Sequence, residues 1–282
     1  MHLLLFLYTC LIALFFTAPA REASEPFKAS ERFTASTPAN NQIKAFLNIP
    51  LADSVDFIRW DLTFDEKEYK LSARYGLSKP NTNGFINDGQ LVEITDNWSK
   101  SGSERVINNG SKSIKLINLN PALLHFIDAS GKFMIGNGGW SYTLNNSDSK
   151  ETGYIWAGQK SNILKDSVKY EGRTPSGIPG VPHESVYNKL KWQIIFYADA
   201  KTNTPTTYRA VSAPWRSRGG KRGTWKIVKD AKGGVIYQLF NEDDTVFVSL
   251  LKADDNILLF MDGNGGLLVG NEDFSYTLNK YF

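Results

Sequence analysis

Cysteine is almost absent from this 282-residue chain: the only one, Cys10, lies in an apolar run near the first residue. Once that run is removed, no disulfide, thiol nucleophile or thiolate metal site can form. Histidine is scarce too, with three in all, and the Gly-x-Ser-x-Gly elbow of serine hydrolases does not occur. Because His125 and His183 have no evident Ser or Asp partners, the sequence predicts no catalytic triad and no enzyme.

Other sources of chemistry are also missing. The paired carboxylates Asp243/Asp244 and Asp254/Asp255 lie in polar turns, and nothing places two of them across a cleft as a glycosidase requires. One imidazole beside one carboxylate, His183 and Glu184, does not make a metal site. A formal net charge of +3 is too small to indicate nucleic acid or an anionic membrane as a partner, and we expect no stable membrane insertion once the apolar first residues are cleaved. The sequence therefore predicts no catalytic residues, no cofactor and no metal.

The first residues are apolar. Leu3–Phe16 is a mainly apolar stretch, too short to span a bilayer, and small residues follow it at 17–24. This outline predicts a signal peptide over residues 1–23, an uncleaved anchor being the alternative, followed by a flexible polar leader over 24–42. We expect an exported protein, located in the periplasm, in the cell envelope or outside the cell.

The rest of the chain contains a repeat. Leu123–Asn145 aligns without a gap with Ile257–Asn279, and each segment ends in Ser-Tyr-Thr-Leu-Asn. Upstream, Phe57–Phe64 aligns with Lys189–Phe196, which pairs Trp60 with Trp192. The repeat predicts two domains of about 110 residues, a normal domain size. Their predicted bounds are 43–145 and 153–282, with a polar linker between them.

Each unit consists of short segments that alternate apolar and polar residues, separated by Gly- and Asn-rich turns. This pattern is typical of antiparallel meanders, and closure into a barrel removes exposed sheet edges. We therefore predict an all-β fold of two tandem small barrels. Asp128 and Asp262 are expected in equivalent turns, and Trp60 and Trp192 at equivalent buried positions.

A family likeness lies in the same residues. The second unit opens with Tyr-Glu-Gly-Arg-Thr-Pro-Ser (170–176), continues through Lys-Leu-Lys-Trp (189–192), and closes with Leu-x-Phe-x-Asp-x-x-Gly and Ser-Tyr-Thr-Leu (258–278). In this order the elements resemble the NlpE-like domain of bacterial envelope proteins. The resemblance implies a small lipocalin-like barrel and a link to copper resistance and envelope stress. It covers the second unit throughout and the first mainly in its C-terminal half.

The chain departs from that family at its cysteine motif. Ser176 stands where the first cysteine would be, and Gly-Val-Pro-His (180–183) offers no second one. Soft Cu(I) prefers thiolate or thioether ligands, and beyond Met1 the only thioethers are Met134 and Met261, in apolar segments of different units. Copper binding by the family's cysteine route therefore does not transfer to this chain.

Two further features allow more than one interpretation. The basic run at Arg216, Arg218, Lys221 and Arg222 is glycine-rich and suits either an anion or partner site or a solvated hairpin loop. The indoles of Trp60, Trp192 and Trp225 could line an open lumen or fill it. We expect an exported, non-enzymatic NlpE-like protein that binds an envelope partner or a small ligand. The alternative is a lipocalin-like carrier of an apolar molecule.

Overall fold

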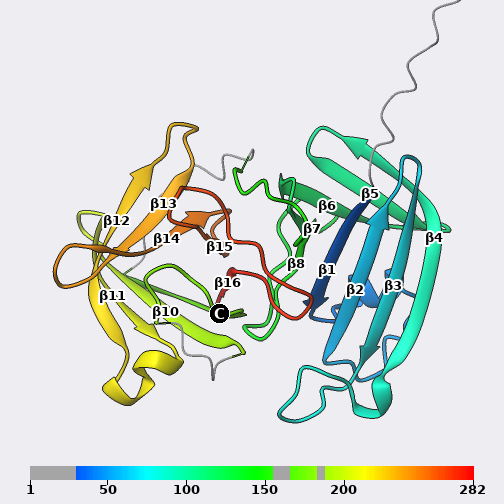
Figure 1. Cartoon of the computed structure of the whole chain (residues 1–282), viewed down its shortest axis with the longest axis horizontal. Coiled ribbons are helices and arrows are strands. Elements are labelled where there is room, and N and C mark those ends of the chain that lie inside the picture. Colours follow the sequence, from blue (N-terminus) through cyan, green and yellow to red (C-terminus); the bar gives the residue numbers. More distant parts are fainter. Residues whose placement is uncertain (1–29, 155–165, 183–187) are drawn as a thin grey trace, which may run out of the picture.

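The computed structural model describes residues 30–154, 166–182 and 188–282. They form two closed antiparallel barrels of eight strands that lie side by side (Figure 1). Within each barrel, strands consecutive in sequence are neighbours in space, and the last strand pairs with the first. The predicted fold class, two tandem meander barrels, is confirmed. The predicted signal peptide lies outside the described residues.

Barrel 1 contains eight strands: β1 (Glu31–Thr37), β2 (Phe57–Phe64), β3 (Glu68–Gly76), β4 (Gln90–Ser101), β5 (Glu104–Asn109), β6 (Lys112–Asn120), β7 (Leu123–Ile127) and β8 (Thr143–Asn145). Barrel 2 contains eight more: β9 (Ser167–Thr174), β10 (Leu190–Asp199), β11 (Thr204–Val211), β12 (Lys221–Lys229), β13 (Val235–Phe240), β14 (Val246–Lys252), β15 (Ile257–Phe260) and β16 (Thr277–Lys280). In the described part of the chain, three short helices connect strands: α1 (Asn41–Phe46), η1 (Ile86–Asp88) and η2 (Ala213–Arg218).

Barrel 1 begins earlier than the sequence predicted. Strand β1 lies within the stretch 24–42 expected to be a flexible leader, and it pairs with both β2 and β8 to close the barrel. Helix α1 then covers the lumen with the buried side chains of Ile43 and Phe46. The boundary of the first unit therefore moves from residue 43 to Glu31. Only Phe33 and Ala35 are apolar among its seven residues, and the buried Ser36 and Thr37 are polar, which hid its alternation.

The two tryptophans occupy equivalent buried positions, as predicted. Trp60 and Trp192 are both fully buried, and each indole Nε1–H donates to the threonine hydroxyl that ends the neighbouring first strand. The acceptors are Thr37 Oγ1 at 2.8 Å and Thr174 Oγ1 at 2.9 Å. Both threonines precede a proline. The same polar contact therefore anchors the core of each barrel.

The turns at Asp128 and Asp262 are equivalent as well. Each carboxylate accepts hydrogen bonds from backbone N–H groups two and four residues later. Gly131 and Gly265 take the positive φ of each turn, +80° and +82°, where a side chain would be strained.

Aromatic side chains fill the barrels. The Trp60 and Phe126 rings lie 4.9 Å apart across barrel 1. In barrel 2 the ring of Phe196 lies 4.9 Å from Trp225 and 5.3 Å from Tyr237. The indoles of Trp60 and Trp225 are thus packed against other aromatic rings in the cores of the two barrels.

The barrels also share an apolar cluster. Leu119, Leu123 and Phe133 of barrel 1 pack with Ile257, Leu259 and other buried residues of barrel 2, together with Tyr154 of the connecting segment. Such shared burial is the dominant stabilising term when two folded units associate. Among the described residues, no helix is long and apolar enough to cross a membrane.

Candidate functional site

The contact between the barrels is pseudo-symmetric. The hydroxyl of Ser141 lies 2.5 Å from that of Ser275, and the hydroxyl of Thr143 lies 2.9 Å from that of Thr277. In both pairs the two residues hold the same position in the two repeats. A contact in which one surface meets its own copy is the isologous arrangement of a two-fold dimer. Here one chain supplies both copies.

Backbone contacts obey the same symmetry. The N–H of Gly136 donates to Asn279 Oδ1 at 2.7 Å, and the N–H of Gly270 donates to Asn145 Oδ1 at 2.9 Å. Both asparagines are buried, at 2% and 1% exposed. Each barrel thus uses the last residue of its repeat to hold a loop of the other.

The charged residues of the interface do not follow the pseudo-symmetry. Arg59, which precedes Trp60, forms an ion pair with Asp273 of the opposite barrel. Lys191, which precedes Trp192, is its counterpart, but the residue that corresponds to Asp273 is Gly139. In the same comparison Ser36 corresponds to Arg173, because each directly precedes the threonine that binds the tryptophan. One half of the interface therefore has an ion pair between the barrels, and the other half has Lys191 and Arg173 without an aspartate at the equivalent position.

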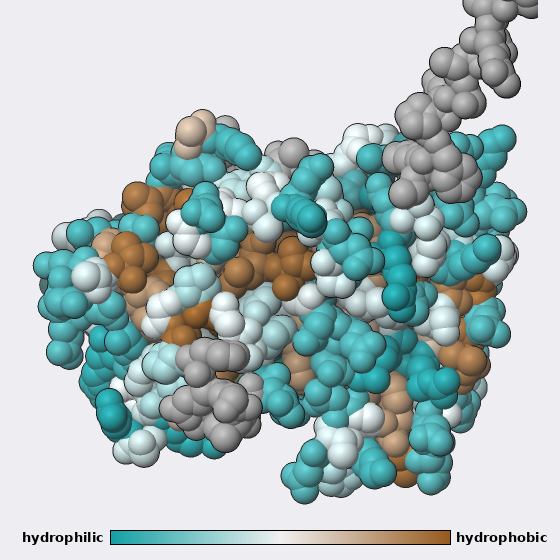
Figure 2. Space-filling model, in the orientation of Figure 1, coloured by the Kyte–Doolittle hydropathy of each residue, from teal (hydrophilic) through white to brown (hydrophobic). Residues whose placement is uncertain are grey.

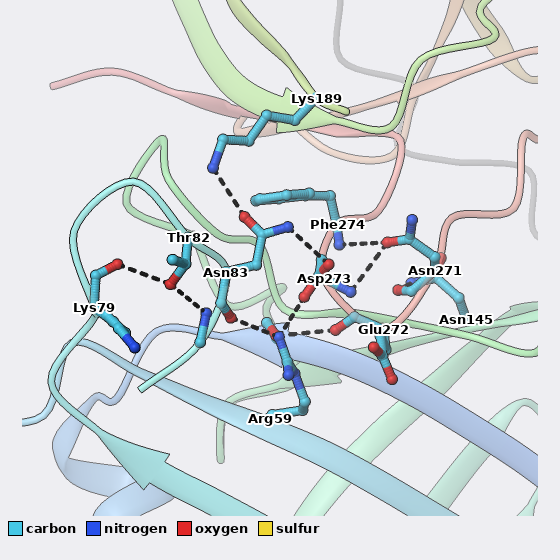
Figure 3. Close-up of polar contacts among 12 residues, drawn as sticks. Arg59, Lys79, Thr82, Asn83, Asn145, Lys189, Asn271, Glu272, Asp273 and Phe274 are labelled. Atoms are coloured by element: carbon cyan, nitrogen blue, oxygen red, sulfur yellow. Dashed lines mark hydrogen bonds and ion pairs between the residues drawn. The ribbon is translucent and has the colours of Figure 1, made fainter. Parts of the chain in front are cut away.

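Asn83 connects this ion pair to Lys189 of barrel 2 (Figure 3). Its backbone carbonyl oxygen accepts from Arg59 Nη2 at 2.7 Å, and its side-chain Nδ2 donates to Asp273 Oδ2 at 2.8 Å. Its Oδ1 accepts from Lys189 Nζ at 2.9 Å. The loop between β3 and β4 of barrel 1 is thus fixed against barrel 2 by one side chain.

A cleft of about 770 Å³ opens between this loop and barrel 2, and we call it the basic cleft. Figure 2 shows a notch flanked by hydrophilic surface between the lower ends of the two barrels. Barrel 1 contributes one cation and barrel 2 contributes four; these are Lys79, Arg173, Lys189, Lys191 and Arg216. No Asp or Glu is among the described residues that line it. Ser78 and Thr82 add hydroxyl groups.

The cations in the cleft act on one another. Partial burial and the nearby Arg173 guanidinium lower the pKa of Lys189, and Asp273 opposes this effect. The Arg173 guanidinium lies 5.5 Å from the centre of the Trp140 ring, and Lys189 Nζ lies 5.4 Å from that of Phe274. Aromatic faces hold cations in place without neutralising them. A ligand anion would relieve the mutual repulsion of these groups.

The basic loop predicted as an anion or partner site is divided by the structure. Arg216 lies in η2 and lines the basic cleft. Arg218, Lys221 and Arg222 line another cavity, of about 640 Å³, which also holds Glu242 and Asp243. Carboxylates therefore offset these three cations, and only one of the four predicted residues belongs to the basic cleft.

The other cleft cations were missed because they are far apart in sequence, at positions 79, 173, 189 and 191. The chain brings them together only when two barrels meet. The sequence did contain one signal, because the two repeats differ in charge at aligned positions. Lys189 aligns with the uncharged Phe57, and Gly139 aligns with Asp273.

Of the remaining candidates, His125, Met134 and Met261 are buried core residues. His125 is fully buried, with Nε2 2.9 Å from the carbonyl oxygen of Met134 and Nδ1 2.9 Å from Thr143 Oγ1. Burial lowers its pKa to about 4, so the ring is neutral near pH 7. His183 lies outside the described residues. Within the described ranges, no three His, Cys, Asp or Glu side chains come together as a metal site. Met134 and Met261 are buried in separate apolar clusters.

Comparison with known proteins gives no further identification. No family model, curated protein or solved structure matches the chain. Any functional conclusion depends on the chain's own residues.

Proposed function

We propose that this chain is an exported, non-enzymatic NlpE-like protein of the cell envelope that binds an anionic partner in the basic cleft. The observation that carries the proposal is the set of five cations around one cleft whose described lining holds no carboxylate. Cations gathered without partners are costly to the folded state, and a bound anion offsets that cost. Such a cleft also attracts acidic partners over distances of about 10 Å at an ionic strength of about 0.1 M.

The contacts between the barrels favour binding over chemistry. Two reciprocal asparagine contacts, two hydroxyl pairs and an apolar cluster hold the barrels together, so the two walls of the cleft keep their spacing. A preorganised site binds without the entropic cost of ordering its walls. The cleft presents cations and hydroxyl groups, and no general base or nucleophile pair is found among its described lining residues.

A protein partner suits the surroundings of the cleft. The connection from β3 to β4 supplies Lys79 and exposes Leu77 and Ile86, and Leu91 follows at the start of β4; each of the three apolar side chains is more than 40% exposed. Figure 2 shows apolar surface at the lower end of the barrel drawn on the right. Apolar side chains beside a charged cleft are typical of a protein–protein contact.

The NlpE-like likeness supports an envelope role and gives no support to copper. The hydroxyl of Tyr276, in the closing Ser-Tyr-Thr-Leu element, donates to the carbonyl oxygen of Ser176 at 2.5 Å. The two most family-like segments therefore meet, with serine where the family has cysteine. We propose that the chain takes part in reporting envelope stress through a partner. The lipocalin-like carrier is the weaker candidate, because buried aromatic rings pack on one another in the core of each barrel.

A titration with an acidic peptide tests the proposal. Fluorescently labelled hexaglutamate should bind the mature protein, and its affinity should fall as salt is raised from 50 to 300 mM, because screening weakens exposed charge attraction. The double variant R173E/K191E should bind at least about tenfold more weakly. The matched control Lys229→Glu changes an exposed lysine of β12 outside the cleft lining and should bind like the wild type. Wild-type protein that does not bind the peptide at low salt would refute the proposal.

A further inference from the structure

We infer that the group bound in the basic cleft is a carboxylate, and that it lies beside Gly139, at the place that Asp273 fills in the other half of the interface. This inference rests on the proposed function and adds the chemistry of the ligand and its position. It follows from the internal symmetry of the chain, which provides a filled copy of the site next to an open one.

The filled copy shows which group the site accepts. In barrel 1, Arg59 pairs with the Asp273 carboxylate, whose second oxygen accepts from Asn83. In barrel 2 the counterpart of Arg59 is Lys191, and Gly139 has no side chain to offer it. Arg173 adds a guanidinium where barrel 1 has only Ser36, so the open half is the more cationic.

The two loops have the same geometry. Asn137 Oδ1 accepts from the N–H groups of Gly139 and Trp140, at 3.0 and 2.9 Å. Asn271 Oδ1 accepts from those of Asp273 and Phe274 at the same two distances. An aspartate is therefore compatible with this turn, and the glycine at 139 is not required by the backbone.

The open position faces a cation. A Cβ at Gly139 would lie 3.2 Å from Asn137 Oδ1, the oxygen that caps this turn, 3.7 Å from Arg173 Nη1 and 3.8 Å from its Cζ. Glu171, on the same strand as Arg173, has its Oε1 engaged by Lys169 at 3.3 Å and by Gln193 at 2.9 Å, and its Oε2 lies beside Gly138, 3.2 Å from where a Cβ there would be. A ligand carboxylate beside Gly139 would meet the planar guanidinium, which suits two parallel hydrogen bonds.

A self-supplied carboxylate tests the inference directly. Gly139→Asp should place the missing group in the chain and compete with the ligand, weakening hexaglutamate binding about tenfold. Gly263→Asp is the matched control: it makes the same change at a turn glycine where an added Cβ would meet no atom within 4 Å. Binding by that variant should stay within about twofold of wild type. Thermal melts of both variants report whether they fold.

If Gly139→Asp does not fold, Arg173→Gln replaces it, with Lys229→Gln as control and the same tenfold loss expected. Competition separates the sources of the carboxylate: displacement by citrate at matched charge indicates a small carboxylate, and displacement only by peptide indicates an acidic segment. Both outcomes support the inference. Displacement by phosphate in preference to either carboxylate would overturn it.

The failure of this inference differs from that of the proposed function. If the peptide binds, R173E/K191E weakens it and Gly139→Asp binds as tightly as Gly263→Asp, the cleft binds anions but the position beside Gly139 is wrong. If wild-type protein binds no peptide, the proposed function itself is wrong.

Discussion

The hydroxyl of Thr143 lies 2.9 Å from that of Thr277, and this pair connects the interface to the buried imidazole of His125. The carbonyl oxygen of Met134 can only accept, so His125 Nε2 carries the proton and Nδ1 accepts from Thr143. Thr143 must then accept from Thr277, which accepts from Ser275. A neutral histidine therefore sets the direction of hydrogen bonds across the pseudo-two-fold axis.

His125 should make the stability of the protein depend on pH. Its folded-state pKa of about 4 is below the value of 6.5 expected for an unfolded chain, so unfolding takes up a proton between these values. The stabilisation from the neutral ring is complete above about pH 6.5 and is lost as pH falls toward 4. By linkage the loss amounts to roughly 2–3 kcal/mol at pH 4.5.

His125→Leu, which installs the residue found at Leu259 in the other repeat, should remove that dependence. Urea unfolding gives the free energy of unfolding at pH 7.5 and at pH 4.5, and its decrease between the two pH values should be smaller for the variant than for the wild type. An equal decrease in the two proteins would show that the ring is not held neutral.

The reciprocal asparagines should contribute unequally. Asn145 Nδ2 donates to the carbonyl oxygen of Asn271 at 3.0 Å, whereas Asn279 Nδ2 is buried and has no hydrogen-bond partner among the described residues. Asn145→Ala should therefore lower the free energy of unfolding by about 1 kcal/mol more than Asn279→Ala does. Each variant is the other's control, because both remove an acceptor from a glycine N–H. Equal losses, or a larger one for Asn279→Ala, would contradict the assignment.

The tryptophan anchors should matter in both barrels. Thr37→Val and Thr174→Val keep the side-chain shape but leave the indole N–H of Trp60 or Trp192 buried without an acceptor. Each should lower the free energy of unfolding by roughly 1–3 kcal/mol. Thr95→Val, on the exposed face of β4, is the control and should change stability little. Losses no larger than that of the control would show that the contact is unimportant.

Copper binding is predicted to be weak. The sequence has no cysteine after Cys10, and the two thioethers Met134 and Met261 are buried in different apolar clusters. Thioethers hold Cu(I) tightly only when several converge. Titration of the mature protein against a strong Cu(I) chelator should give no stoichiometric transfer. Retention of one Cu(I) per chain would contradict this prediction.

The fold could be predicted from sequence because its signals are local. Alternation along Phe57–Phe64 and the repeated Asp turns report strands and bends directly, and the repeat reports two domains. Strand β1 was not predicted, because most of its residues are polar and a proline follows it. The same composition is typical of a flexible leader.

The basic cleft could not be predicted in this way, because it exists only between the barrels. Arg173 and Lys79 come from different barrels, and their proximity depends on contacts such as Asn83 to Lys189. The basic loop at 216–222 was predicted as a site because its charges are close together in the sequence. In the structure, Arg218, Lys221 and Arg222 line a cavity together with the carboxylates of Glu242 and Asp243. Closely spaced basic residues in a sequence can therefore lie next to carboxylates in the folded chain, whereas basic residues far apart in sequence can gather without them.

Backbone amide shifts in an NMR titration with hexaglutamate test the central claim most directly, since the chain contains its own control. Amides of Gly139, Arg173, Lys189 and Lys191 should shift together and saturate, while those of their counterparts Asp273, Ser36, Phe57 and Arg59 should move little. Equal shifts in both sets, or shifts confined to residues outside the basic cleft, would contradict the account.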